Sequence, residues 1–338
     1  AASWAAVAER FAGRPEVAGY DLLNEPEVSR PAAELQPIYD AFLAEVIDGI
    51  RAAEAGAPFD HIVFVEPAVP AADPTRGLVI PSPAALGGDV TNIAASVHNY
   101  MESIGSEMTL EAMNDLIELI TGNLGVPNWG GEYGFWDVEP DTLAVARRYA
   151  ADEDAHLWGG AWWQWRQSCG DPHAVRWDGD EVVPLGGTSY HLNMLDCPGN
   201  GDLGPNDAFL DILGRGYPRA APGRLTSVTS DPATGHMTVE AEAAESGGEL
   251  VVWTPTARGP EHSLLVENLV DVVEHPVEGG RIITARVAAP GPYSLAVAPG
   301  DDEPIDPTDP TDPTDPIDPT DPTDPTDPTD PTDPTDPT

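Results

Sequence analysis

Two segments of the chain each place a glutamate directly after a run of apolar residues. The run 17–23 is followed by Asn-Glu-Pro at 24–26, and the segment 126–131 leads into Glu132. Two carboxyl groups on separate strand ends are the minimum equipment for glycoside hydrolysis. One must be protonated so that it can donate to the leaving oxygen, and the other must be ionised so that it can attack the anomeric carbon. Glu25 and Glu132 are candidates for such a pair, and Glu66, which follows the run 61–65, is a third carboxylate in a similar position.

Other polar and aromatic residues follow the remaining apolar runs. His98 and Tyr100 come after 92–97, Glu66 follows 61–65, and Trp163 lies on the tryptophan-rich run 157–165. In a parallel α/β barrel the carboxyl ends of the strands form the catalytic face, and indole faces stack well on sugars. Trp165 shares the strand parity of Trp163, so the choice between them stays open. Glu66 is interpreted as a substrate-lining or supporting group, with a plain structural carboxylate as the alternative.

The apolar runs alternate with segments of helical periodicity, which would hold the strand ends in place. Apolar residues follow helical spacing over 35–50 and 110–120, and 141–156 and 208–213 also read as helices. Strands that alternate with helices indicate parallel βαβ units. The expected fold of residues 1–216 is part of a (β/α)8 TIM barrel, about strands 4–8.

Residues 217–299 have a different pattern. Six short strand-like runs, separated by turn signals such as Gly247-Gly248 and Gly279-Gly280, predict a small antiparallel β-sandwich. Residues 300–338 are nearly pure Asp-Pro-Thr repeats, with nothing apolar to bury. That segment is predicted to be a disordered linker. Spacers of this kind join extracellular modules to one another or to the cell wall, so a secreted or cell-surface location is expected.

The composition excludes several classes of partner. The chain has 338 residues, 58 acidic and 15 basic, for a formal charge of −43. The last 38 residues hold 14 of the acids, so the rest of the chain is also acidic. Nucleic acid and anionic membranes attract basic patches, so neither is an expected partner. No run of 18 apolar residues exists, and no transmembrane segment is expected.

Four motifs resemble a known family of enzymes. The sequence DLLNEP at 21–26 resembles the fourth-strand signature of glycoside hydrolase family 5, and GGEYG at 130–134 resembles its seventh-strand nucleophile segment. The segment 162–173, WWQWRQSCGDPH, is similar to the endoglycoceramidase branch of that family. YPRA at 217–220, which leads into the sandwich, is similar to that branch too. The resemblance covers roughly residues 15–299.

The resemblance implies a retaining glycosidase in which Glu25 is the general acid/base and Glu132 the nucleophile. Asn24 would hydrogen-bond the sugar 2-hydroxyl, and Tyr100 would contact Glu132 and help to keep it ionised. This chemistry needs no metal and no organic cofactor.

His98 and Trp163 would line the sugar site in the same resemblance. The expected substrate is a glycolipid, cleaved between its sugar and ceramide. A β-1,4-glucanase acting on polysaccharide is the alternative within the same fold. A non-catalytic sugar-binding or cell-wall protein is the alternative in another class.

Two further expectations concern the chain as a whole. Cys169 and Cys197 bracket the loop after the last barrel strand, and a disulfide between them would suit a secreted protein; two buried thiols are the alternative. A complete barrel has eight strands, and five are predicted here. The chain is therefore expected to be the C-terminal part of a longer protein and to be inactive or poorly folded alone.

Overall fold

The computed structural model describes residues 1–27, 31–68, 79–88, 90–102, 107–134, 140–168, 175–178, 181–184, 193–195, 204–205, 207–255 and 262–299. The Asp-Pro-Thr repeat and the cysteine pair Cys169 and Cys197, with the expectations attached to them, lie outside the described residues. Among the described helices, none is long and apolar enough to cross a membrane.

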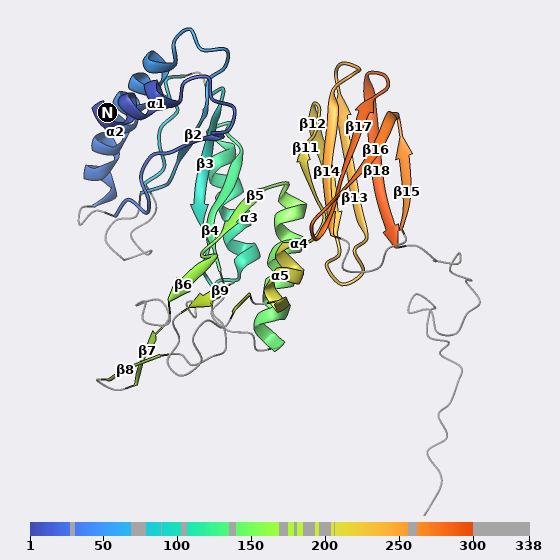
Figure 1. Cartoon of the computed structure of the whole chain (residues 1–338). Helices are drawn as coiled ribbons and strands as arrows, with labels where there is room; N and C mark the ends of the chain where they lie inside the picture. The colour runs from blue at the N-terminus through green and yellow to red at the C-terminus, as the bar shows by residue number, and fades with distance from the viewer. Residues whose placement is uncertain are drawn as a thin grey trace, which may run out of the picture.

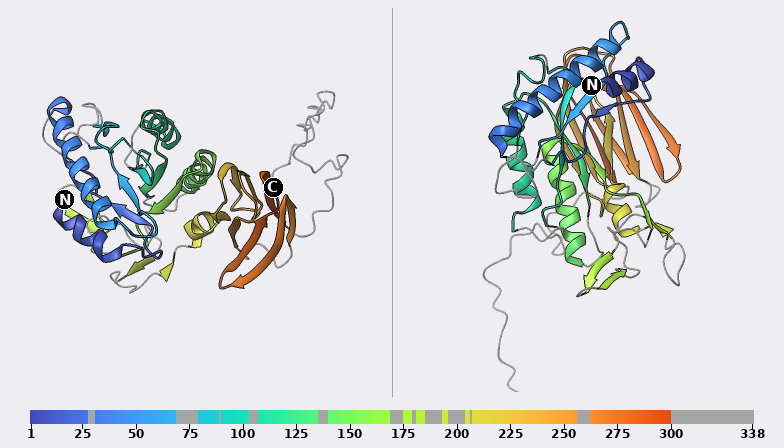
Figure 2. Two further views of the ribbon diagram at one scale, coloured as in Figure 1. Left: turned by 90° about the horizontal axis from the view of Figure 1, so that it is seen from above. Right: turned by 90° about the vertical axis from the view of Figure 1, so that its left-hand side faces the viewer.

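The N-terminal half is a five-stranded parallel sheet that curls into half a barrel, with helices on its outer face (Figures 1 and 2). The strand order is β1-β2-β3-β4-β5, so each strand pairs with the next one in the chain and the outermost strands are β1 and β5. This arrangement confirms the expected partial barrel. Its elements are α1 (Ala2–Phe11), β1 (Gly19–Asp21), α2 (Ala32–Glu54), β2 (Ile62–Val65), β3 (Ile93–His98), α3 (Leu110–Gly122), β4 (Asn128–Tyr133), α4 (Pro140–His156) and β5 (Gly159–Trp162).

The apolar periodicity explains why these elements pack. Helix α2 buries Leu35, Tyr39, Leu43, Val46 and Ile50, which share one face, and strand β3 is buried over most of its length. Thr109 caps α3 through its side chain, which accepts a hydrogen bond from the Ala112 N–H at 3.2 Å. Buried residues of α2 and β3 belong to a core that also includes residues of α1, β1 and β2.

Several short strands and a helix connect β5 to the second half. They are β6 (Arg166–Ser168), β7 (Val175–Asp178), β8 (Glu181–Pro184), β9 (Asn193–Leu195), β10 (Gly204–Pro205) and α5 (Asp207–Leu213). Helix α5 matches the helix expected at 208–213, and it packs against α4 through Phe209 and Ile212.

The C-terminal half is an antiparallel β-sandwich, as expected. Its two sheets have the orders β11-β14-β17-β16 and β12-β13-β18-β15, with a separate core between them. Two of its strands, β11 and β16, were not among the six runs predicted from the sequence. The strands are β11 (Tyr217–Ala220), β12 (Arg224–Ser230), β13 (Met237–Ala243), β14 (Glu249–Pro255), β15 (His262–Glu267), β16 (Leu269–Val277), β17 (Gly280–Val287) and β18 (Gly291–Pro299).

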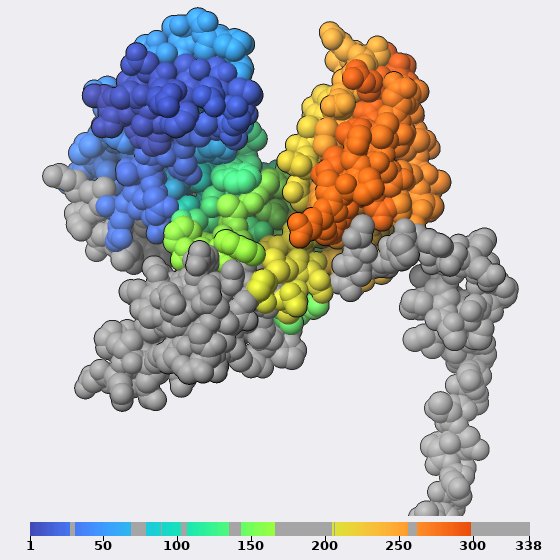
Figure 3. Space-filling model, in the orientation of Figure 1, coloured from blue at the N-terminus to red at the C-terminus, as the bar shows by residue number. Residues whose placement is uncertain are grey.

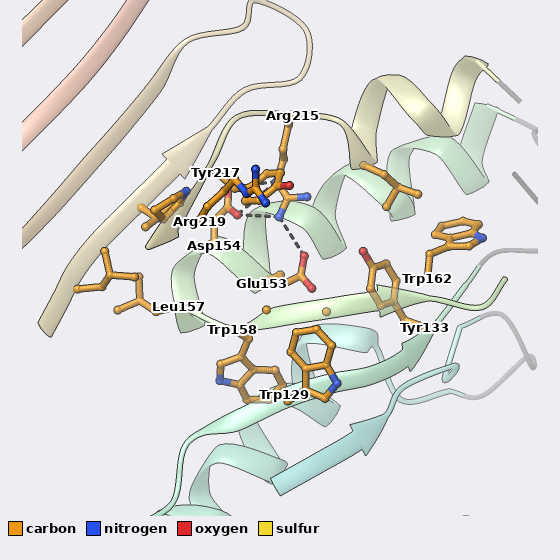
Figure 4. Close-up of a pocket in the computed structure, with 16 residues that line it drawn as sticks. Trp129, Tyr133, Glu153, Asp154, Leu157, Trp158, Trp162, Arg215, Tyr217 and Arg219 are labelled. Atoms are coloured by element: carbon orange, nitrogen blue, oxygen red, sulfur yellow. Dashed lines mark hydrogen bonds and ion pairs between the residues drawn. The ribbon is translucent and has the colours of Figure 1, made fainter. Parts of the chain in front are cut away.

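A buried ion cluster lies where the half-barrel meets the sandwich. Arg215 donates through Nη2 to Glu153 Oε2 at 3.0 Å and to Asp154 Oδ1 at 2.7 Å (Figure 4). Burial raises the pKa of both carboxyl groups, and the guanidinium opposes that rise. A cavity of about 560 Å³ beside the cluster is lined from both halves, for example by Trp158 and Tyr217. In the space-filling view, an open gap separates the two lobes above the part of the chain that joins them (Figure 3).

Candidate active site

The register of the parallel sheet gathers the candidate residues at the carboxyl ends of its strands. Asp21 pairs with Phe64, one residue before the end of β2, and His98 at the end of β3 pairs with Glu132 on β4. Glu66 follows β2 directly, and Glu25 lies four residues after the end of β1. Neighbouring parallel strands end at the same edge, so these side chains meet although they are far apart in the sequence.

An irregularity in the β3–β4 pairing places Glu132 directly opposite His98. Val97 pairs with Gly130 and the next residue, His98, pairs with Glu132, so Gly131 is an extra residue on β4. A Cβ added at Gly131 would overlap Ser96 Oγ and lie 3.1 Å from His98 Nε2. Only glycine fits this close approach, which lets the nucleophile candidate stand beside the imidazole.

Glu25 is the solvent-exposed member of this group of acidic side chains around His98. Its φ is 42°, in the left-handed region that residues other than glycine seldom adopt. Its Oε1 lies 2.9 Å from His98 Nδ1, and the same nitrogen lies 3.5 Å from Glu132 Oε2. The imidazole therefore sits between the two candidate catalytic carboxylates.

Glu66 contacts the backbone of Glu25 and is only 5% exposed. Its Oε2 accepts a hydrogen bond from the Glu25 backbone N–H at 2.9 Å, and its Oε1 lies 3.5 Å from His98 Nε2. Burial raises its pKa to about 7, and His98 and the Glu25 N–H act in the opposite direction. Of the two roles considered for Glu66, this burial favours a supporting group over one that lines the substrate.

Tyr100 lies beside Glu132. Its hydroxyl donates a hydrogen bond to Glu132 Oε2 at 2.9 Å. Burial, followed by the charge of Glu132, raises the pKa of Tyr100 far above its ordinary value, so the phenol keeps its proton and remains a donor. A donor of this kind stabilises the ionised form of the carboxylate.

The aromatic end of β5 adjoins the same residues. The Trp163 N–H donates to the Tyr133 carbonyl at 2.8 Å, and a Cβ added at Gly134 would lie 2.5 Å from the Trp163 carbonyl oxygen and 3.7 Å from Tyr100 Cε1. Trp163 is 40% exposed and Trp165 is 52% exposed. Both indoles are thus accessible, and the backbone contact puts Trp163 next to the Tyr100 side of the site. Asn24 is exposed immediately before Glu25.

Three further polar residues adjoin the site and were not singled out in the sequence: Ser96 and Tyr39, which are buried, and Asp21, which is exposed. Ser96 Oγ donates to Asp21 Oδ2 at 2.8 Å, and burial raises the pKa of Asp21. The Tyr39 hydroxyl donates to the Glu66 carbonyl at 2.6 Å. Asp21 was identifiable as an acid at the end of an apolar strand. Tyr39 fits the apolar face of a helix and gives no such signal.

Within the described part of the chain, Glu25, His98 and Glu132 form the group whose ligand atoms are spaced for a metal ion. One such atom of each residue lies within 4.8 Å of the others. Two carboxylates and an imidazole would suit a divalent cation. The hydrogen bond between His98 and Glu25, however, already engages two of these groups. That the chemistry here needs no metal or organic cofactor remains a prediction.

Comparisons with known proteins place this site in context. Residues 1–168 match the sequence model of Cellulase (glycosyl hydrolase family 5). A solved endogalactoceramidase is 31% identical with a TM-score of 0.68, over 87% of this chain and 60% of that one. Endo-glycoceramidase II from Rhodococcus sp., in a cellobiose-like isofagomine complex, is 24% identical with a TM-score of 0.62, over 89% of this chain and 62% of that one.

A second structure of the Rhodococcus sp. protein is a complex with ganglioside GM3. It is 23% identical to this chain with a TM-score of 0.59, and the match covers 89% of this chain and 63% of that one. The chain thus spans about three fifths of each of these solved proteins. The search of curated proteins returned no match.

Proposed function

We propose that the protein containing this chain is a retaining β-glycosidase, because residues 1–168 match the model of glycosyl hydrolase family 5. Its acid/base is Glu25 and its nucleophile is Glu132. The observation that carries the proposal is the spacing of these two groups, since an oxygen of one lies within 4.8 Å of an oxygen of the other. Retaining glycosidases hold their carboxyl groups about 5–5.5 Å apart, and inverting ones about 6.5–9.5 Å. The spacing supports the retaining route.

In the first step Glu132 attacks the anomeric carbon while the bond from that carbon to the leaving oxygen breaks. Glu25 gives its proton to that oxygen, so a free alcohol leaves and a glycosyl ester remains on Glu132. In the second step Glu25 takes a proton from a water molecule, whose oxygen attacks the same carbon and breaks the ester. Two inversions return the original configuration and restore the proton on Glu25.

The neighbours of the pair have matching tasks in this scheme. The Tyr100 hydroxyl, 2.9 Å from Glu132 Oε2, stabilises the ionised nucleophile before attack. Asn24 is accessible for the sugar 2-hydroxyl, where a hydrogen bond that strengthens in the transition state lowers the barrier. The exposed face of Trp163 offers a platform for the sugar ring, and His98 lines the same site.

The proposed substrate is a glycolipid, cleaved between its sugar and ceramide. Support comes from the 31% identity to an endogalactoceramidase over 87% of this chain. Because ceramide is an alkyl alcohol and a poor leaving group, its departure depends on proton donation by Glu25. A β-1,4-glucanase remains the alternative within the family.

We also propose a secreted or cell-surface location, with the repeats after residue 300 as a spacer. The support is compositional. Proline at every third position of this segment favours an extended chain, and the aspartates repel one another. Detection of the protein in the culture medium or on the cell surface would support the proposal, and its retention inside cells would contradict it.

The decisive test assays the full-length protein that contains this chain on galactosylceramide, glucosylceramide and a soluble β-1,4-glucan. Glu132→Gln is expected to lower turnover by at least about 10³-fold, because it removes the nucleophile. Glu9→Gln, an exposed position on α1, is the matched control and should leave turnover unchanged.

The products distinguish the alternatives. Ceramide release in which the β-anomer of the sugar appears first in the NMR spectrum supports the proposal, and the α-anomer contradicts the retaining route. Cleavage of the glucan alone identifies a glucanase. A folded protein that binds these compounds without turnover is a binding protein.

A further inference from the structure

Glu66 contacts the proposed acid/base through its backbone. The Glu25 N–H donates to Glu66 Oε2 at 2.9 Å, which joins the loop after β1 to the end of β2. A carboxyl oxygen can accept this hydrogen bond whether Glu66 is protonated or ionised. Only 5% of the Glu66 surface is exposed, so this residue contacts Glu25 from the protein interior and does not face bulk solvent.

Glu25 depends on a restraint of this kind. Its backbone holds φ at 42°, a conformation that costs free energy for a residue with a side chain. Its side chain is 56% exposed, so packing fixes little of its position. Because the backbone torsions at Glu25 set the direction of its Cα–Cβ bond, a hydrogen bond at its N–H determines where the carboxyl group can reach.

A second route from Glu66 runs through His98. Glu66 Oε1 lies 3.5 Å from His98 Nε2, while Nδ1 of the same ring lies 2.9 Å from Glu25 Oε1. Glu66 therefore restrains Glu25 at both ends, directly at the backbone and through the imidazole at the carboxyl group. The Tyr39 hydroxyl, 2.6 Å from the Glu66 carbonyl, anchors Glu66 from α2.

We propose that Glu66 is a positioning residue for Glu25, holding the acid/base carboxyl group at its working distance from Glu132. This inference rests on the proposed function. Glu66 exchanges no proton with the substrate in this role. Its loss is expected to impair proton transfer by Glu25 more than attack by Glu132.

Two substrates that differ only in their leaving group separate these effects. A dinitrophenyl β-glycoside needs no proton to lose its phenolate, whereas an alkyl β-glycoside of the same sugar does. In the full-length protein, Glu66→Ala is expected to lower kcat/KM on the alkyl glycoside about 10²-fold and on the dinitrophenyl glycoside less than about 10-fold. Glu66→Gln keeps an oxygen that can accept the Glu25 N–H and is expected to restore most of the loss.

Glu25→Gln supplies the reference pattern, and Glu54→Gln, a buried carboxylate that contacts Tyr20 and His61, controls for general destabilisation. If Glu66→Ala does not fold, Glu66→Asp tests the same contact, because it withdraws the carboxylate by one methylene. Equal losses on both substrates, or no loss, contradict the role of Glu66 alone. A wild-type protein that cleaves neither glycoside contradicts the proposed function and the role of Glu66 with it.

Discussion

At the level of single residues, the site concentrates negative charge around one imidazole. Glu25, Glu66 and Glu132 each approach His98 within 3.5 Å, and Asp21 interacts with it electrostatically. Two of these acids, Asp21 and Glu66, have pKa values raised mainly by burial. Both acids therefore bind their protons up to a higher pH than ordinary carboxyl groups do, which limits the repulsion in the group.

The raised pKa of Glu66 predicts a pH dependence of stability. The folded protein binds this proton up to about pH 7, whereas the unfolded chain releases it near 4.5. The contribution of this proton to the free energy of unfolding is therefore complete below about pH 4.5. It is lost as the pH rises through about 7, which lowers the free energy of unfolding by up to about 3 kcal/mol. Glu66→Gln cannot ionise, so its free energy of unfolding is expected to rise relative to wild type between pH 5 and pH 8.

Chemical denaturation of both proteins at the two pH values measures this effect. Tyr39→Phe serves as the control, because it removes a hydrogen bond to Glu66 whose donor stays protonated throughout the range. That variant should be destabilised equally at both pH values. Wild-type and Glu66→Gln curves that stay parallel would show that Glu66 does not titrate in this window.

The residues of the site were identifiable from the sequence to different degrees. Glu25 and Glu132 follow apolar strands within recognisable motifs, so their proximity could be predicted. The contact between Glu66 and the Glu25 backbone could not, because it depends on a left-handed torsion at a residue that is not glycine. Such a torsion is set by the surrounding structure and leaves no pattern in residue types.

At the level of elements, the irregular pairing of β3 with β4 brings the nucleophile to its place. Gly131 is the extra residue, and Ser96 and His98 occupy the space that a side chain at this position would need. The pairing therefore requires a residue without a side chain at position 131, and this requirement can be tested without an activity assay.

Gly131→Ala is expected to destabilise the protein by about 2–4 kcal/mol, because a new methyl group must displace backbone or packed side chains in a buried sheet. The matched control is Gly122→Ala at the end of α3, where an added Cβ meets nothing within 4 Å. That change should be neutral or stabilise by up to about 1 kcal/mol. Thermal unfolding of both variants provides the measurement, and equal melting temperatures would contradict the packing argument.

Elements with strong periodicity were predictable, and those with mixed composition were not. The apolar face of α2 and the buried run of β3 identified both elements with nearly correct bounds. Strand β16 was missed because eight of its nine residues are exposed and it carries charged residues and a proline. An edge strand has one pairing partner and little buried surface, so its sequence need not alternate.

At the level of the whole molecule, a buried cation lies in the segment that connects the half-barrel to the sandwich. Arg215 precedes β11 and contacts two consecutive acids near the end of α4, and the Trp253 indole of β14 donates to the Gly214 carbonyl at 3.2 Å. One guanidinium between two buried carboxylates compensates their desolvation at this junction. The relative position of the two lobes therefore depends on electrostatics as well as on apolar contact.

Arg215→Met is expected to lower the free energy of unfolding by about 3–5 kcal/mol at pH 8, because it leaves Glu153 and Asp154 buried without a cation. Burial already raises the pKa of both acids, and loss of the guanidinium removes the main opposing interaction. Both acids should then bind protons more readily in the folded state, so the deficit is expected to shrink as the pH falls from 8 to 5. Arg219→Ala, an exposed position on β11, is the matched control and should change stability by less than about 0.5 kcal/mol at either pH. Denaturant unfolding of wild type and both variants at pH 5 and pH 8 provides the measurement. If the loss of unfolding free energy in Arg215→Met is the same at both pH values, Arg215 acts through packing alone and the electrostatic explanation of the junction is wrong.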